Sequence, residues 1–201
     1  MTTADRFFAR REPKQQRSRQ TVDAVLEAVQ LVVKRHGTQA ITTNRIAEAA
    51  GVSVGSLYQY FPDKRAIFAA LHDRHVDDVQ QVIGQTAAAC ALAPLREFAC
   101  ELVESLLNVH AEAAELHDVV LSAVPEGAAG FKNALQQTFG RMLSRPNQNR
   151  YSPDETERML FVLPCMVESL VHGAAQQART PSRDGARSEA IRTVLVYVNS
   201  F

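Results

Sequence analysis

Residues 42–64 read TTNRIAEAAGVSVGSLYQYFPDK and contain the most specific structural signals in the sequence. Thr42 is a residue type that caps helices, and we expect a short helix over 43–50 behind it. Ser53 can cap a second short helix, over 54–60, in the same way. Two short helices joined by a tight turn predict a helix-turn-helix.

The residues in and around these helices suit close packing. Gly51 can take the left-handed backbone conformation of the turn, and Ala47 is small where the two helices must approach each other. The apolar side chains expected to face the preceding helix are Ile46, Ala50, Val52 and Leu57. The outward positions of the second helix are then Val54, Gly55, Ser56, Tyr58, Gln59 and Tyr60. An exposed helix of this kind fits the major groove of DNA, with its N-terminal residues nearest the bases.

Helical periodicity continues through the rest of the chain, which shows almost none of the alternation that predicts strands. One apolar stripe, in a helix that starts near Ser18 or Thr21 and ends at Gly37, consists of Val22, Val25, Leu26, Val29 and Val33. Asp63 caps a long amphipathic helix that follows Phe61-Pro62. Further helices are expected over 95–109, 112–124, 127–144, 152–178 and 186–199, with a turn at 180–185. The sequence therefore predicts an all-α protein of about nine helices.

The strongest helix start in the chain is Ser152-Pro153-Asp154-Glu155. It combines a serine cap, a proline at the first helical position and a glutamate three residues after the cap, which is the pattern of a capping box. Pro164 then falls inside the helix, where we expect a kink. Residues 145–151, RPNQNRY, are expected to form a polar loop before it.

Charge divides the chain into two parts. The 201 residues contain 22 basic and 22 acidic side chains, so the formal net charge is zero. Residues 1–75 contain 12 basic and 7 acidic side chains, whereas residues 76–201 contain 10 and 15. The first part is therefore suited to meeting an anion. We expect the boundary between the parts near residue 75, inside the long helix.

Composition also excludes several classes of protein. No apolar run approaches the roughly 18–20 residues of a membrane span, and the N-terminal segment lacks the apolar region of a secretory signal. The cysteines, Cys90, Cys100 and Cys165, are odd in number and widely spaced, which argues against a disulfide framework and for a reducing, cytoplasmic compartment. Their spacing matches no zinc finger, and no cofactor is expected.

One longer motif is specific enough to indicate a family. Residues 51–64 follow the pattern G-V-S-x-G-x-L-Y-x-Y-F-x-x-K, with Ile46-Ala47-Glu48-Ala49-Ala50 before it and Ile67-Phe68 after it. Over about residues 18–75 the chain resembles the DNA-binding domain of the TetR family of bacterial transcriptional regulators. Beyond residue 75 only the helical architecture and the length agree with that family.

The resemblance implies a homodimer without catalytic activity, in which each helix-turn-helix binds one half of a palindromic operator. Residues 1–17 would form a flexible basic arm, 18–75 the DNA-binding domain, and 76–201 a helical domain for effector binding and dimerisation. A small effector bound to that last domain would release the protein from DNA, as in a repressor. The alternatives are an activator of the same fold, or a helical ligand-binding protein or enzyme that does not bind DNA.

The resemblance also implies contacts for individual residues. Thr43 and Lys64 match phosphate contacts at helix N-termini, and Asn44 and Arg45 lie where a base edge or phosphate is reached. The hydroxyls of Tyr58 and Tyr60 match contacts to the DNA backbone, although either ring can simply pack. The full expected set is Thr42, Thr43, Asn44, Arg45, Ser53, Val54, Gly55, Ser56, Tyr58, Gln59, Tyr60 and Lys64. The basic residues Arg6, Arg10, Arg11, Lys14, Arg17 and Arg19 either track the minor groove or form a solvated tail.

For the C-terminal part, the resemblance places an effector pocket among the helices over about 95–178. The candidate lining residues are Phe98, Leu102, Leu106, His110, Leu121, Phe139, Cys165, Met166 and Glu168. Their apolar majority favours an apolar or amphipathic effector, although such residues also make plain core. Two apolar stripes are expected to form the dimer interface, Val162, Leu170, Gly173 and Ala174 in one helix and Ile191, Val194, Leu195 and Val198 in the last.

Other patterns compete with this interpretation. Residues 51–55, GVSVG, match the nucleophile elbow G-x-S-x-G, but an elbow needs a strand before its serine, and a helix cap is the stronger reading of Ser53. His72 and His75, with Asp73 and Asp77, have the spacing of a metal site or of a solvated helix face. The residues Cys165, Glu168 and His172 share one helical face, which can contact a ligand or lie at the dimer interface. Cys90 and Cys100 are expected to be packed thiols.

Overall fold

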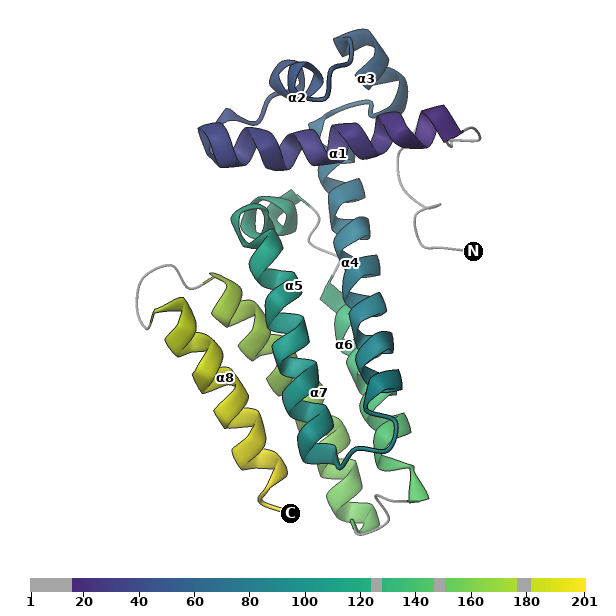
Figure 1. Cartoon of the computed structure of the whole chain (residues 1–201), viewed down its shortest axis with the longest axis vertical. Coiled ribbons are helices and arrows are strands. Elements are labelled where there is room, and N and C mark those ends of the chain that lie inside the picture. The colour runs from purple at the N-terminus through teal and green to yellow at the C-terminus, as the bar shows by residue number, and fades with distance from the viewer. Residues whose placement is uncertain (1–15, 124–127, 147–150, 177–181) are drawn as a thin grey trace. The chain divides into compact units, whose positions relative to one another are not determined.

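The computed structural model of the protein describes residues 16–123, 128–146, 151–176 and 182–201. Over these ranges the chain forms helices and no strands, which confirms the predicted all-α class. The helices are α1 (Gln16–His36), the short 3₁₀ helix η2 (Thr38–Ala40), α2 (Thr43–Ala49), α3 (Val54–Tyr60), α4 (Lys64–Ala89), α5 (Leu95–Ala123), α6 (Ala128–Leu143), α7 (Pro153–Gln176) and α8 (Arg183–Val198) (Figure 1).

The chain forms two compact units. The first comprises Met1–His75 and Glu115–Gly127, and the second comprises Val76–Ala114 and Ala128–Phe201. Helices α4 and α5 therefore each contribute to both units.

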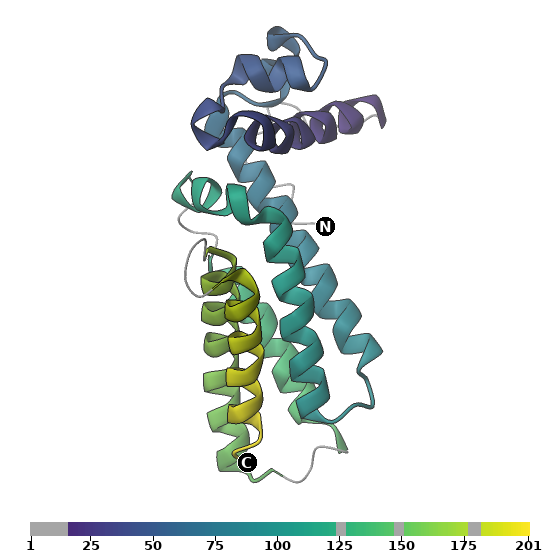
Figure 2. The same ribbon diagram turned by 60° about the vertical axis from the view of Figure 1, so that its left-hand side comes forward.

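In the first unit, α2 and α3 lie together on one side of α1 (Figures 1 and 2). Its core is apolar and draws on α1, α2, α3, α4 and α5. The largest contributors are Val25, Leu26, Val29, Val33, Ile41, Ile46, Leu57, Phe61, Ile67, Phe68, Leu71, Leu116 and Val120. Two of the four predicted inward residues, Ile46 and Leu57, have no exposed surface, and Ala50 and Val52 pack at the edge of the same core.

Local capping produces the two short helices. The Thr42 side chain accepts a hydrogen bond from the Arg45 amide (3.3 Å), and the Ser53 side chain accepts one from the Ser56 amide (3.0 Å). Each cap satisfies an amide that has no partner within the helix. Gly51 has φ of +67°, a conformation that L side chains rarely adopt, so the turn between the helices requires glycine.

The second unit is a helical bundle of the end of α4, most of α5, and α6, α7 and α8 (Figure 1), in which α7 packs against both α6 and α8. Its fully buried side chains include Leu95, Phe98, Leu102, Leu106, Leu135, Phe139, Met142, Met159 and Leu163. The rings of Phe98 and Phe139 meet edge to face with centroids 5.7 Å apart, a favourable aromatic geometry.

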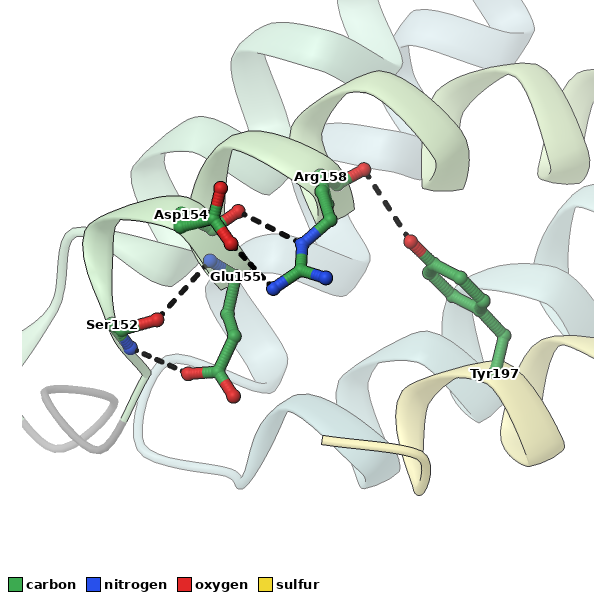
Figure 3. Close-up of polar contacts among 5 residues, drawn as sticks. All are labelled: Ser152, Asp154, Glu155, Arg158 and Tyr197. Carbon is green, nitrogen blue, oxygen red and sulfur yellow. Dashed lines mark hydrogen bonds and ion pairs between the residues drawn. The ribbon is translucent and has the colours of Figure 1, made fainter.

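The start of α7 is the predicted capping box (Figure 3). The Glu155 amide donates to the Ser152 hydroxyl (3.2 Å), and the Ser152 amide donates to the Glu155 carboxylate (2.7 Å). The backbone N–H of Ser152 holds the pKa of the Glu155 carboxyl below its ordinary value, because that hydrogen bond favours the charged form. Helix α7 continues through Pro164, and the Arg158 guanidinium pairs with Asp154 one turn earlier (2.6 Å).

Three boundaries differ from the predictions. The two helices expected over 95–109 and 112–124 are one helix, α5, because the alanine-rich stretch between them contains no helix breaker. Helix α8 begins at Arg183 rather than near 186, since Ser182 caps it through the Gly185 amide (3.2 Å). Helix α1 begins at Gln16, so Ser18 lies inside it and does not cap it. The remaining residues of the predicted loop and turn, 147–150 and 180–181, lie outside the described residues.

Helix α7 corrects a further expectation. Residues Pro153–Ala175 are long and apolar enough to cross a membrane by length and composition. Met159, Leu163, Val167 and Val171 of this helix are fully buried in the bundle. Burial of these residues in the core of the second unit explains part of the apolar character of α7, whereas Phe161 of the same helix is 74% exposed.

Candidate nucleic-acid interface

Helix α3 has one buried face and one exposed face. Leu57 has no exposed surface and anchors the helix in the core, whereas the next residue, Tyr58, is 41% exposed. Gly55 and Gln59 are also exposed, and Val54 and Ser56 are half-buried. The predicted outward face is therefore present, with a tyrosine at its centre and a glycine in its first turn.

Hydroxyl contacts connect this face to the neighbouring helices. The Tyr58 hydroxyl lies 3.2 Å from the Thr43 hydroxyl at the start of α2. The Tyr60 hydroxyl donates to the Ser18 hydroxyl of α1 (3.4 Å), and the Tyr60 ring is half-buried. Tyr58 thus presents its hydroxyl beside another exposed helix start, while the hydroxyl of Tyr60 is engaged within the protein.

The Ser53 hydroxyl caps a helix, and this structural role competes with the role of a nucleophile. The Ser53 hydroxyl accepts from the Ser56 amide and lies 2.8 Å from the Ser56 hydroxyl. The residues before Ser53 form α2, so the strand that a nucleophile elbow needs is replaced by a helix. The helix-cap interpretation of Ser53 is confirmed.

The cations expected at the interface are exposed. The Arg45 guanidinium reaches the Ala40 carbonyl (3.4 Å), and Lys64 stands at the start of α4 with its ammonium 5.6 Å from the centre of the Phe68 ring. The Asp63 carboxylate caps α4 by accepting from the Ala66 amide (2.9 Å), as predicted. Thr42 and Asn44 are exposed, and Thr43 is half-buried. Of the expected basic arm, residues 1–15 lie outside the described residues, whereas Arg17 and Arg19 lie in the first turn of α1.

Sequence reasoning missed Ser18 as a partner of α3. It lies 42 residues before Tyr60, and no local pattern connects the two positions. Its hydroxyl fixes the end of α3 against α1, so it helps to set how the exposed face is presented.

In the second unit, the apolar residues expected to line a pocket make core. Phe98, Leu102, Leu106 and Phe139 have no exposed surface. Met166 packs against this core, Cys165 and Glu168 are half-buried, and the side chain of Leu121 falls outside the described part of α5. A shallow hollow of about 510 Å³ lies elsewhere, on α6, and is lined by Gln137, Gly140, Arg141 and Ser144.

His110 stands apart from these apolar residues. It is 1% exposed, and its Nδ1 lies 2.9 Å from the Leu106 carbonyl of the preceding turn. Its ring meets His172 of α7 at 4.9 Å and Phe131 of α6 at 5.5 Å between centroids. The predicted polar face of α7 therefore meets His110 through His172.

The predicted dimer stripes divide between core and surface. Ala174, Val194 and Val198 are buried within the unit, at 6%, 1% and 1% exposure. Gly173 is exposed, and Val162, Leu170, Ile191 and Leu195 are half-buried. Two exposed apolar side chains that the prediction omitted accompany them, Phe161 at 74% and Val196 at 59%.

The expectation that His72 lies on a solvated face is wrong. His72 is 9% exposed, with its Nδ1 3.7 Å from the Asp73 carboxylate, because it shares a helical face with the buried Phe68 and Leu71. Among the described side chains, no three His, Cys, Asp or Glu groups come together to hold a metal ion.

The cysteines are free thiols with part of their surface covered. Burial raises the pKa of the Cys90 thiol; the carboxylates of Glu101 and Glu97 raise it further, and Arg145 lowers it. Burial, followed by the carboxylates of Glu104 and Glu101, also raises the pKa of Cys100. Neither thiol has the depressed pKa of a reactive cysteine.

Comparison with known proteins agrees with this geometry. Residues 26–71 match the family model described as bacterial regulatory proteins, tetR family. Over 51 residues the chain is 49% identical to the nucleoid occlusion factor SlmA of Haemophilus ducreyi, a match that covers 25% of each protein. The chain thus spans about a quarter of the length of the curated relatives it matches.

Solved structures extend the similarity to nearly the whole chain. A TetR-family transcriptional regulator from Mesorhizobium loti superposes with a TM-score of 0.67 at 15% identity, over 92% of this chain and 98% of that one. The regulator FadR of Bacillus subtilis, in complex with stearoyl-CoA, superposes with a TM-score of 0.58 at 15% identity, over 88% of this chain and 97% of that one. The helix-turn-helix region of this chain therefore belongs to the TetR family of bacterial regulatory proteins, and the chain as a whole has the fold of that family's transcriptional regulators.

Proposed function

We propose that this protein is a cytoplasmic, non-enzymatic transcriptional regulator that binds a palindromic operator as a homodimer. The observation that carries the proposal is the exposed face of α3, which a fully buried Leu57 anchors and a hydroxyl contact joins to α2. The excess of basic over acidic side chains in residues 1–75 supports attraction to the phosphate backbone.

The start of α3 is the part that would lie nearest the bases. Gly55 is exposed, and a Cβ atom there would meet only the Ser53 hydroxyl, at 3.9 Å. The fold therefore does not require glycine at this position, and its absent side chain leaves room for another molecule to approach the helix closely. We infer that Val54, Gly55, Ser56 and Gln59 face base edges in the major groove.

The other polar residues would position the protein on the phosphate backbone. Thr43 and Tyr58 offer two neighbouring hydroxyls, and Lys64 and Arg45 offer exposed cations. Thr42 and Ser53 contribute through the helix starts that they cap, together with Asn44. Tyr60 contributes through its contact with Ser18, which holds the end of α3. Such contacts fix register and carry little sequence information.

The second unit is proposed to bind a small apolar or amphipathic effector that releases the protein from DNA. Its apolar interior supports the class of effector, and the B. subtilis protein of similar fold is in complex with stearoyl-CoA. His110, with Cys165 and Glu168 on the facing helix, would provide the polar contacts. Leu121 and the apolar residues Phe98, Leu102, Leu106, Phe139 and Met166 would line the site after rearrangement of the core.

The dimer is proposed to form through α7 and α8. Phe161 and Val196 are large apolar side chains that the subunit leaves exposed, and Val162, Leu170, Gly173, Ile191 and Leu195 are partly exposed on the same two helices. Ala174, Val194 and Val198 would support this surface from within. A mass of one subunit by light scattering at micromolar concentration would contradict the proposed dimer.

The proposal is tested by selecting a randomised duplex library on the purified protein at moderate salt and sequencing the bound fraction. Enrichment of a palindrome is expected, because two identical half-sites are read at once. No enrichment, even at low salt, would favour a helical ligand-binding protein that does not bind DNA. Reporter output after deletion of the gene separates the proposed repressor from an activator.

A further inference from the structure

The C-terminal end of α4 depends on a side chain from a distant part of the sequence. The last carbonyls of any helix have no partners within it, and a cation in the last turn often compensates for them. The last turn of α4 contains no basic residue of its own. The residues that follow α4 satisfy part of its end, since the Cys90 amide donates to the Thr86 carbonyl and the Ala91 amide to the Ala88 carbonyl. A cation that compensates for the rest of this end has to come from another element.

Arg145, just beyond α6, supplies that donor. Its guanidinium donates to the carbonyls of Ala91 (2.7 Å), Cys90 (3.2 Å) and Ala87 (3.5 Å). These contacts join positions 54 to 58 residues apart in the sequence. The planar guanidinium can hold several carbonyls at once in a fixed geometry, which a lysine ammonium on a flexible stem does less well.

The surrounding charges favour this position of Arg145. The negative end of the α4 dipole points toward the guanidinium. The carboxylates of Glu97 and Glu101 on α5 act on the Cys90 thiol in the same neighbourhood, with an effect opposite to that of Arg145. The start of the Arg145 side chain is held in turn, because its amide donates to the Met142 carbonyl of α6 (3.3 Å).

We propose that Arg145 is a positioning residue that clamps the end of α4 to the end of α6, and that the DNA affinity of the dimer depends on this clamp. Helix α4 begins at Lys64, shortly after α3, and ends at Ala89, next to the carbonyls that Arg145 bonds. Because α4 is one continuous helix that contributes to both units, we expect a shift of its end to change the spacing of the two recognition helices in the proposed dimer. This second step rests on the function proposed above.

The test compares Arg145→Ala and Arg145→Lys with the control Arg141→Ala. Arg141 lies one turn earlier and is exposed, and its guanidinium bonds Thr138 on its own helix (3.3 Å), so its removal leaves the end of α4 intact. Hydrogen exchange is followed at the amides of Cys90 and Ala91, which bond the Thr86 and Ala88 carbonyls of α4, and at the amide of Ala93, which bonds the Cys90 carbonyl in the turn that follows. DNA affinity is measured on the selected palindrome and on a duplex that carries one half-site.

In Arg145→Ala we expect those amides to exchange at least about tenfold faster, while amides in the middle of α7 stay unchanged. Affinity for the palindrome should fall by at least about fivefold, and affinity for the single half-site should stay within about twofold of the wild-type value. The exchange rates and the palindrome affinity of Arg145→Lys should lie between those of the wild type and Arg145→Ala, and both quantities in Arg141→Ala should match the wild type. If Arg145 only stabilised the fold, Arg145→Ala would weaken binding to both duplexes equally.

Unchanged exchange in Arg145→Ala would overturn the clamp. Faster exchange with unchanged affinity for the palindrome would overturn its role in DNA binding. If Arg145→Ala does not fold, Arg145→Lys decides by the same two readouts. If the wild type selects no duplex, the proposed function and the DNA step fail together, whereas the exchange experiment still decides whether Arg145 clamps α4.

Discussion

Substituting Gly55 by alanine should separate folding from DNA binding. The new Cβ atom would meet only the Ser53 hydroxyl, at 3.9 Å, which is an ordinary van der Waals contact. Gly55 lies in the first turn of α3 with a helical backbone, so alanine should stabilise the fold by about 0.5–1 kcal/mol. For a chain of this size, that gain corresponds to a rise in Tm of roughly 1–4 °C.

The same methyl group should weaken DNA binding. Insertion of a methyl into a closely packed contact costs about 1–3 kcal/mol, and this corresponds to a loss of roughly 5- to 150-fold in affinity. The assay is fluorescence anisotropy on the selected duplex at fixed salt, with Tm measured on the same preparations. A matched control is Gly84→Ala, because Gly84 is also exposed in a helix, on α4, and its Cβ would meet nothing within 4 Å.

We expect Gly84→Ala to raise Tm without changing DNA affinity. Two results would refute the reasoning about Gly55. Wild-type affinity in Gly55→Ala would show that no partner approaches this part of α3 closely. A lower Tm would show that the fold, and not a partner, requires glycine there.

Three further predictions follow from particular contacts. Tyr58→Phe should lower DNA affinity by about tenfold with little change in Tm, since it removes a hydroxyl proposed to reach a phosphate, and the contact of that hydroxyl with Thr43 is exposed to solvent. Tyr60→Phe should lower stability by about 1 kcal/mol, because its hydroxyl bonds Ser18 in a partly buried position. Equal effects of the two substitutions on DNA affinity would contradict this distinction. The depressed pKa of Glu155 contributes stability that is present above the ordinary glutamate pKa and is lost as pH falls through the lower folded value. Glu155→Gln should therefore flatten the dependence of Tm on pH in that acidic window, and an unchanged dependence would contradict this role of the capping box. Alkylation of Cys90 at neutral pH should be slower than alkylation of a fully exposed cysteine, because the pKa of the Cys90 thiol is raised. Arg145→Ala should raise that pKa further, since the guanidinium lowers it. An apparent pKa at or below the ordinary value in the pH profile of alkylation would show that the thiol is not partly buried beside Glu101 and Glu97.

Local chemistry explains why the helix-turn-helix was predictable. Thr42, Ser53 and Gly51 act on their own neighbours through caps and a positive φ, and the capping box of Ser152 and Glu155 does the same. Such signals lie within three or four residues, so the sequence displays them directly. Helix α8 begins before the predicted start because Ser182 caps it, although Gly185 in its first turns is a residue type that favours a turn.

Long-range packing explains what was not predictable. Val194 and Leu195 are both apolar and adjacent, yet the first is core and the second is partly exposed, and only the position of α7 decides between them. His72 is buried because its helical face packs into the core, although Asp73 and Arg74 directly follow it. The clamp by Arg145 and the contact between Ser18 and Tyr60 join positions more than 40 residues apart. No local periodicity encodes such pairs.

The central claim is that α3 of each subunit reads a major groove. Methylation interference on the selected duplex tests this directly, because methylation at guanine N7 blocks the major groove and methylation at adenine N3 blocks the minor groove. We predict that N7 methylation prevents binding at guanines in two half-sites whose centres are about one helical turn, or a multiple of it, apart. Interference confined to the minor groove or to a single half-site, or no interference at all, would contradict the account.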